Sequence, residues 1–130
     1  MFVDASALIA IITEESDGEA LARQLQESAS PITSPLAIYE AVLGVKRKTK
    51  GDMATACRDV TFLLDAAKLR VVPVDPDDAV RALDAFDRYG KGTGHPAGLN
   101  MGDCFAYAVA KSRGVRLLYK GSDFAQTDLG

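Results

Sequence analysis

Histidine and cysteine are scarce in this chain. There is one histidine, His95, in a glycine-rich loop, and there are two cysteines, Cys57 and Cys104, within helical patterns that lack the spacing of metal ligands. We expect the cysteines to be reduced core thiols of a cytoplasmic protein, and His95 to lie at the surface without a catalytic role. The acidic side chains are therefore the residues to consider for chemistry.

Long apolar runs and a strong basic charge are also absent. No apolar run approaches the roughly 20 residues needed to span a bilayer, and residues 1–13 lack the basic leader and the small-residue cleavage site of a signal peptide. We therefore expect a cytoplasmic chain with no membrane partner. The net charge of −3 argues against a general nucleic-acid coat protein, which is usually basic. It does not exclude an enzyme that handles nucleic acid through a local basic patch and bound cations.

Residues 1–130 are expected to form one domain, because the chain has the length and apolar content of one core and no repeat or linker. Apolar periodicity predicts helices at 5–13, 16–28, 35–49, 53–69, 75–89 and 100–113, and strands at 1–3, 32–33, 70–75 and 115–119. The 70–75 strand is expected to be buried, although Pro73 places it near an edge. This order predicts a three-layer α/β/α domain with a mainly parallel four- or five-stranded sheet.

Asp4 is the residue around which the other candidates are arranged. It ends the first strand and leads directly into a helix, so it lies at the carboxyl edge of the sheet, where ligands collect in open α/β folds. The alternative is that Asp4 simply caps the following helix, since aspartate is a favoured N-cap residue. The choice depends on whether other carboxylates converge on the same crevice.

Two of these acids are Glu40 and Asp123. Glu40 lies on a mostly apolar side of the 35–49 helix, where a carboxylate must either reach solvent or find a partner. Asp123 follows the last strand by a few residues, the topological place that Asp4 holds on the first strand. Taken alone, Asp123 is an ordinary turn residue.

Asp103 is the third acid, and it stands three residues after Asn100 at the start of the last helix. This spacing resembles a capping box, in which the two side chains satisfy each other's backbone amides. Gly102 favours a second role, because glycine weakens a helix but lets another group approach the backbone closely. Asp103 also precedes an apolar run, so we expect it at the inner end of the helix, facing the edge of the sheet.

The joint arrangement of the four acids favours a metal site. Two of them follow strands and two lie on helix faces that can abut the strand ends. Like charges held a few ångströms apart repel strongly, so a cluster of carboxylates requires a cation. Oxygen ligands favour a hard ion such as Mg²⁺ or Mn²⁺, with waters and substrate phosphate completing the shell.

These segments resemble the PIN-domain ribonucleases, specifically the VapC toxins of bacterial toxin–antitoxin pairs. The resemblance rests on Asp-Ala-Ser at 4–6, Ile-Tyr-Glu-Ala around Glu40, Leu-Asn-Met-Gly-Asp-Cys-Phe at 99–105 and Leu-Leu-Tyr-Lys-Gly-Ser-Asp-Phe at 117–124. It covers essentially the whole chain and implies that Asp4, Glu40, Asp103 and Asp123 form an acidic metal site. One departure is Ser122, because relatives of this type often carry two acids before the phenylalanine.

The resemblance also implies the activity, the supporting residues and the partners. It implies a Mg²⁺-dependent endoribonuclease, with Mn²⁺ as an alternative ion, that is neutralised by a cognate antitoxin and forms a homodimer. Ser6 would support Asp4, and Asn100 would support Asp103. Candidate residues for contact with RNA phosphates are Lys46, Arg47 and Lys48, whose alternative role is that of a solvated helix end. Candidates for an antitoxin groove or dimer surface are Tyr39, Leu43, Leu8 and Ile12.

Two rival classes share the α/β layering. A non-catalytic receiver-type module would use an acid such as Asp75 with Lys120, but receivers alternate strand and helix strictly and carry adjacent acids after the first strand. A haloacid-dehalogenase-like phosphatase would need a second acid at position 6, where this chain has Ser6.

Overall fold

The computed structural model describes all 130 residues and contains four short strands, six helices and one short 3-10 helix. In chain order these are β1 (Phe2–Val3), α1 (Ala5–Ile12), α2 (Gly18–Glu27), β2 (Ile32–Thr33), α3 (Pro35–Thr49), α4 (Met53–Ala66), β3 (Arg70–Val71), α5 (Pro76–Tyr89), α6 (Met101–Ser112), β4 (Leu117–Leu118) and η1 (Phe124–Gln126). The predicted order of elements is confirmed. None of the helices combines the length and the apolar composition needed to cross a membrane.

The four strands form one parallel sheet in the order β3-β2-β1-β4. Phe2 is aligned with Ile32 on one side and with Leu117 on the other, so the N-terminal strand lies inside the sheet. Because all strands are parallel, their carboxyl ends share one edge of the sheet. The residues that follow β1 and β4, Asp4 and Tyr119, therefore start from the same edge.

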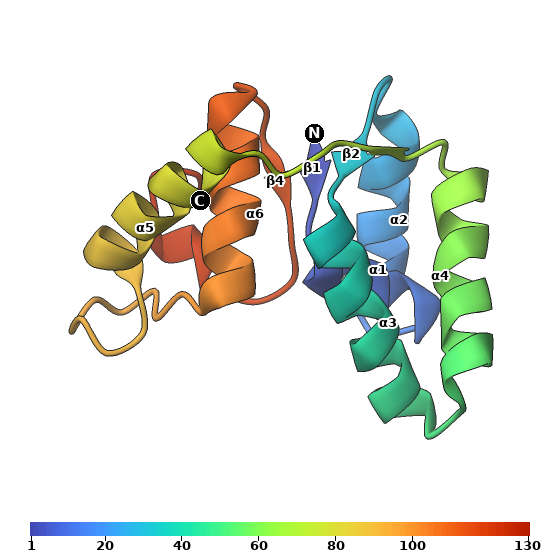
Figure 1. The fold of residues 1–130 in the computed structure, drawn as a ribbon. Helices are drawn as coiled ribbons and strands as arrows, with labels where there is room; N and C mark the ends of the chain where they lie inside the picture. The colour runs from blue at the N-terminus through green and yellow to red at the C-terminus, as the bar shows by residue number, and fades with distance from the viewer.

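Helices cover both faces of the sheet, as expected for three layers. Figure 1 shows α5 and α6 on one face and α1 to α4 on the other. The alternation of side chains along β1 divides the core accordingly, because successive strand residues point to opposite faces. Phe2 is fully buried in the cluster that contains α5 and α6 residues, and Val3 is fully buried in the cluster formed by α1 to α4.

Local sequence signals fix where several helices begin. Ser34 caps α3 by accepting a hydrogen bond from the Ala37 amide at 3.1 Å, and Pro35 occupies the first turn, where its missing N–H costs nothing. α3 ends at Thr49 as predicted, and Lys50 follows with a left-handed backbone (φ 55°). These short-range features were predictable because each depends only on neighbouring residues.

Three expectations about burial were wrong. The predicted 70–75 strand is only the two-residue β3, and both of its residues are exposed because β3 is the outermost strand. Cys57 is exposed on α4, whereas Cys104 is buried as expected. Leu8, a candidate for a surface role, is fully buried beneath α3 and α4.

Candidate active site

Asp4 occupies the carboxyl end of β1 and caps α1. Its carboxylate accepts hydrogen bonds from the Ser6 amide at 3.0 Å and from the Ser6 hydroxyl at 2.6 Å, and only 4% of the residue is exposed. Burial raises the pKa of Asp4, while the bonds from Ser6 oppose that rise. The Ser6 hydroxyl in turn accepts a bond from the Lys120 amide at 3.0 Å, which joins the ends of β1 and β4. Asp4 is therefore both a helix cap and a buried carboxylate at the sheet edge.

A cleft of about 300 Å³ opens beside Asp4. Its lining residues come from the start of α1, from α3 and from the start of α6, and they are Asp4, Ala5, Ser6, Ile9, Glu40, Leu43, Arg47, Asn100 and Asp103. Three of the four predicted acids and both predicted supporting residues thus line the same cleft. Asp4 therefore caps α1 and also shares a cleft with two of the other predicted acids.

Glu40 reaches this cleft from α3. No basic side chain forms an ion pair with it, and burial raises its pKa to about 7, with the negative charges of Asp4 and Asp103 adding to the shift. Its carboxylate lies against Gly102: a Cβ atom at position 102 would stand 1.9 Å from Oε2 and 2.3 Å from Cδ. The sequence predicts that another group approaches the backbone closely at Gly102. This prediction is confirmed, and the group is the Glu40 carboxylate.

Asp103 is held at the start of α6 by the predicted capping box. Its carboxylate accepts a bond from the Asn100 amide at 3.1 Å, and its own amide donates to the Asn100 side chain at 2.9 Å. Burial raises the pKa of Asp103 to about 6, the backbone bond from Asn100 lowers it, and the charges of Asp4 and Asp123 raise it. The cap and the acidic cleft therefore use the same side chain.

Asp123 stands apart from the other three acids. It is exposed in the turn after β4, makes no side-chain capping bond and does not line the cleft. Its charge nevertheless contributes to the raised pKa values of Asp4 and Asp103. Asp123 thus belongs to the electrostatic surroundings of the cleft rather than to its wall.

The donor set suits a hard divalent cation in an open site. No three acidic, histidine or cysteine side chains converge closely enough to form a ready-made metal cage. Mg²⁺ does not require one, because it is usually held by one or two carboxylates while waters and substrate phosphates fill its other positions. The cleft offers carboxylate oxygens whose pKa values are raised by one another and by burial, and a bound cation would relieve that repulsion.

The basic residues of α3 differ in their surroundings. Arg47 is exposed and lines the cleft, which is the place expected of a phosphate contact. Lys48 pairs with Glu15 at 2.6 Å, and Lys120 pairs with Glu15 and Asp17 at 3.2 Å each. Lys48 is thus already engaged in an ion pair within the protein. No sequence pattern predicts these ion pairs, because Lys48 and Lys120 lie far along the chain from Glu15 and Asp17.

The edge of the parallel sheet thus gathers one buried and two half-buried carboxylates beside an exposed guanidinium group, a donor set that suits a nuclease acting on phosphodiesters with a divalent cation. The chain matches the PIN domain family over residues 1–129. It is 45% identical to a VapC ribonuclease of Rhizobium meliloti over 140 aligned positions that cover 99% of each chain. It is 38% identical to the ribonuclease VapC42 of Mycobacterium tuberculosis, over 99% of this chain and 96% of that one.

Solved structures agree on the fold. The structure of Mycobacterium tuberculosis VapC20, described as a toxin that cleaves the sarcin–ricin loop, superposes with a TM-score of 0.75 at 18% identity, covering 95% of this chain and 92% of that chain. A toxin–antitoxin complex from Klebsiella pneumoniae gives a TM-score of 0.72 at 16% identity, covering 98% and 92%. This chain belongs to the PIN-domain family, as a ribonuclease toxin of the VapC type. Ribonucleases of this family generally depend on a divalent metal ion.

The receiver-type alternative is wrong. Asp75 caps α5 through a bond from the Asp78 amide at 3.0 Å, and Lys120 is paired with Glu15 and Asp17. Neither residue is therefore arranged for phosphate acceptance, and the family match assigns the fold to another class.

Proposed function

We propose that the chain is a Mg²⁺-dependent endoribonuclease toxin, with Mn²⁺ able to replace Mg²⁺, whose acidic cleft is blocked by a cognate antitoxin. The supporting observation is that Asp4, Glu40 and Asp103 line one cleft and that none of them forms an ion pair with a lysine or arginine. Carboxylates left without a protein cation in this way suit an added cation. The assignment to the ribonucleases rests on the family match and on the similarity to VapC ribonucleases.

Each residue of the cleft has a role that its position supports. Asp4 and Asp103 hold the cation, Ser6 fixes the carboxylate of Asp4, and Asn100 fixes that of Asp103. Glu40 adds a third negative charge to the surroundings of the cation and orients the attacking water, because its carboxylate faces the cleft from α3 and accepts a proton near neutral pH. Asp123 adds negative charge at the rim. When bound, the divalent ion supplies Lewis-acid activation of water and neutralises charge that develops on the phosphate.

Arg47 is the residue best placed to contact an RNA phosphate. It shares the cleft with the acids, and its planar guanidinium can bind phosphate oxygens in a bidentate manner. Lys46 lies on the same helix end and adds to the local positive charge. Such contacts hold the backbone of the RNA and do not read its bases.

The antitoxin is expected to place a basic side chain into this cleft. A cationic group that occupies the space between the carboxylates would relieve their repulsion and exclude the divalent ion. The similarity of the fold to a chain of a toxin–antitoxin complex supports such a partner. Tyr39, which is 63% exposed, lies one helical turn before Leu43, which lines the cleft, and it offers an apolar contact on that side of α3.

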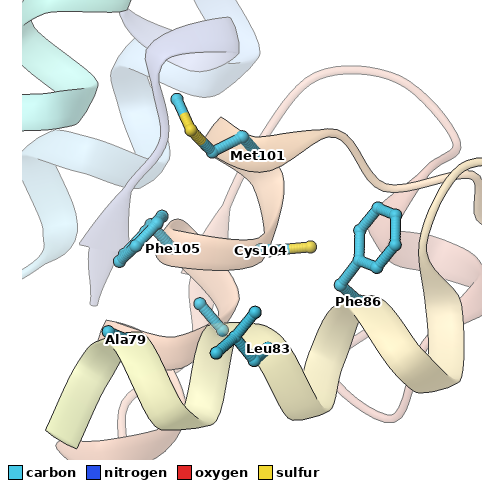
Figure 2. A pocket seen from close by; sticks show the side chains of 7 residues that line it. Ala79, Leu83, Phe86, Met101, Cys104 and Phe105 are labelled. Carbon is cyan, nitrogen blue, oxygen red and sulfur yellow. The ribbon is translucent and has the colours of Figure 1, made fainter.

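We further propose that two copies of the chain associate through the groove between α5 and α6. This groove of about 290 Å³ is lined only by apolar residues, and Figure 2 shows Leu83 and Phe86 of α5 beside Cys104 and Phe105 of α6, with Met101 at the start of α6. Leu83 is 71% exposed and Met101 is 66% exposed. A patch without any charged lining is typical of the core of homodimer interfaces rather than of transient contacts.

Cleavage of total cellular RNA by the purified chain, with and without Mg²⁺ or Mn²⁺, tests the proposed function beside Asp4→Ala. We expect cutting that requires the ion and that falls by more than about 100-fold in the variant, because even outer partners of a metal site are worth 10–100-fold. Circular dichroism checks that the variant is folded. Equal cutting by both proteins would indicate a contaminating nuclease and would contradict the assignment of Asp4.

A further inference from the structure

The packing of Glu40 against Gly102 gives the first turn of α6 a role in the site. The carboxylate of Glu40 occupies the space that a Cβ atom at position 102 would need, with distances of 1.9 Å to Oε2, 2.3 Å to Cδ and 2.4 Å to Oε1. Real Cβ atoms do not approach other heavy atoms this closely. Any residue other than glycine at position 102 would therefore displace the Glu40 carboxylate.

The backbone conformation at position 102 does not require glycine. The three nearest atoms to a Cβ atom there all belong to the Glu40 carboxylate group, the far end of a flexible side chain that can rotate away. The residue lies inside α6 and has no left-handed backbone, unlike Gly98 (φ 57°) and Gly114 (φ 63°). Alanine would also strengthen a helix at such a position. On local grounds, alanine would be the better residue.

We propose that Gly102 is a positioning residue: its missing side chain leaves the space in which the Glu40 carboxylate is held, in the cleft that Asp4 and Asp103 also line. This inference rests on the proposed function, because it concerns the geometry of the same cleft. The space at Gly102 lets Glu40 of α3 pack against the first turn of α6, next to Asp103, which the capping box holds in place. A side chain at position 102 would leave Asp4 and Asp103 in place and remove only the third carboxylate.

Other glycines of the chain do not share this arrangement. A Cβ atom at Gly44 would meet the Ile9 side chain at 2.2 Å, and one at Gly18 would meet the backbone oxygen of Ala10 at 2.7 Å. Those two positions are limited by apolar packing and by the backbone. Gly102 is the buried glycine whose space is filled by a cleft carboxylate.

A double-mutant cycle tests the proposal with four proteins: the natural chain, Gly102→Ala, Glu40→Ala and the double variant. Thermal unfolding and calorimetric Mn²⁺ binding are measured on each. In the Glu40→Ala background the added methyl group has room, so Gly102→Ala should raise Tm by about 3 °C through helix propensity. In the natural background the same change should give no rise, because Glu40 must be expelled.

Mn²⁺ affinity provides the second readout. Gly102→Ala and Glu40→Ala should each weaken binding about tenfold, and the double variant should be no weaker than either single variant. Equal Tm changes in both backgrounds, with unchanged Mn²⁺ affinity in Gly102→Ala, would overturn the proposal. If Gly102→Ala fails to fold while the double variant folds, the obstacle is Glu40 and the proposal stands; if both fail, the obstacle lies elsewhere and the proposal is wrong.

The cycle also separates this proposal from the proposed function. If Glu40→Ala leaves Mn²⁺ affinity unchanged, the role of Glu40 in the cleft is wrong, whereas the Tm values still report whether Glu40 fills the space at position 102. If Glu40→Ala weakens binding but Gly102→Ala does not, only the role of Gly102 is wrong.

Discussion

The helices α5 and α6 both begin with a capping box, but the two boxes lie in different surroundings. In α5, Asp75 and Asp78 exchange side-chain bonds with each other's amides at 3.0 Å in both directions. In α6, Asn100 and Asp103 do the same at 2.9 and 3.1 Å. The two capping boxes are equivalent as caps, so the cap alone says nothing about chemistry.

The difference lies in what surrounds the third residue of each helix. Asp78 accepts a bond from the Ser112 hydroxyl at 3.3 Å and has Arg81 at 3.9 Å, so donors and a cation surround it. Asp103 faces the carboxylates of Asp4 and Glu40, and burial raises its pKa to about 6. The capping box of α5 is therefore structural, because Arg81 pairs with the carboxylate of Asp78 and Ser112 donates a hydrogen bond to it. The capping box of α6 leaves the carboxylate of Asp103 without a positive partner and available for a ligand.

The largest effect on Mn²⁺ affinity is expected when Asp103 of α6 and Asp78 of α5 are each changed to asparagine. Asp103→Asn keeps an oxygen for the cap but removes the charge, so Mn²⁺ affinity by calorimetry should fall by about 100-fold with little change in Tm. Asp78→Asn is the matched control: it should leave Mn²⁺ affinity unchanged and lower Tm by a few degrees, because Arg81 and Ser112 lose their charged partner. Retained Mn²⁺ binding in Asp103→Asn would mean that Asp103 is only a cap.

The pH dependence of the cleft should sharpen the comparison further. Cation binding requires ionised carboxylates, and the pKa values are about 7 for Glu40 and about 6 for Asp103. Mn²⁺ affinity should therefore fall as the pH falls from above 7 toward 5, by roughly tenfold or more. Asp78→Asn should keep this profile, whereas Glu40→Gln should lose its upper part. A profile that is flat between pH 5 and pH 8 would contradict these raised pKa values.

In the metal-free protein the same shifts act on stability in the opposite sense. The folded chain binds protons more tightly than the unfolded chain, in which the pKa is 3.8 for Asp103 and 4.5 for Glu40. The free energy of unfolding should thus decrease as the pH rises from about 4 to about 7. Because both side chains remain partly exposed, solvent screening limits the effect, and about 1 kcal/mol is expected.

A smaller effect is expected from the faces of α5 and α6 that point away from the cleft. Leu83→Glu places a charge in the apolar groove that both helices line, and it should shift a dimer toward monomer at micromolar concentration by size-exclusion chromatography with light scattering. Phe62→Glu is the control, because Phe62 is 76% exposed on α4, outside this groove. Only monomer for the natural chain would remove the proposed dimer, and Mn²⁺ affinity should stay unchanged in both variants.

The smallest effect is expected at the basic end of α3. Arg47→Gln should weaken RNA binding a few-fold and reduce its salt dependence by about 0.7 in log–log slope, the value for one phosphate contact on a single strand. Arg58→Gln removes the same charge from α4 and should change neither quantity. An unchanged slope for Arg47→Gln would show that Arg47 does not contact phosphate.

Much of the fold was predictable because its signals are local. The caps at Ser34, Asp75 and Asn100 depend on nearby residues, and the helix ends follow from them. Burial was harder, because it depends on strand order. The exposure of β3 follows from its place as the outermost strand, which Pro73 signalled but which the expectation of burial ignored. The exposure of Cys57 follows from the outward face of α4, which cannot be read from neighbouring residues.

The candidate site was predictable in part for the same reason. The spacing and the resemblance nominated Asp4, Glu40 and Asp103, and these line one cleft, but no pattern showed that Asp123 would stand outside its wall. The pairing of Lys48 with Glu15 was also hidden, since it joins α3 to the segment that follows α1. Gly102 signalled a close approach, although the sequence could not name Glu40 as the approaching group.

The place of β1 between β2 and β4 has a consequence for the protein while it is being synthesised. Phe2 pairs with Leu117, and the Ser6 hydroxyl accepts its bond from the Lys120 amide, 114 positions further along the chain, so an early strand is completed by residues made much later. A chain still being synthesised carries Asp4 and Glu40 long before α6 and β4 exist. Until then, Asp4 lacks both Asp103 and the strand that flanks it. The cleft that Asp4, Glu40 and Asp103 line is therefore complete only after α6 has been made.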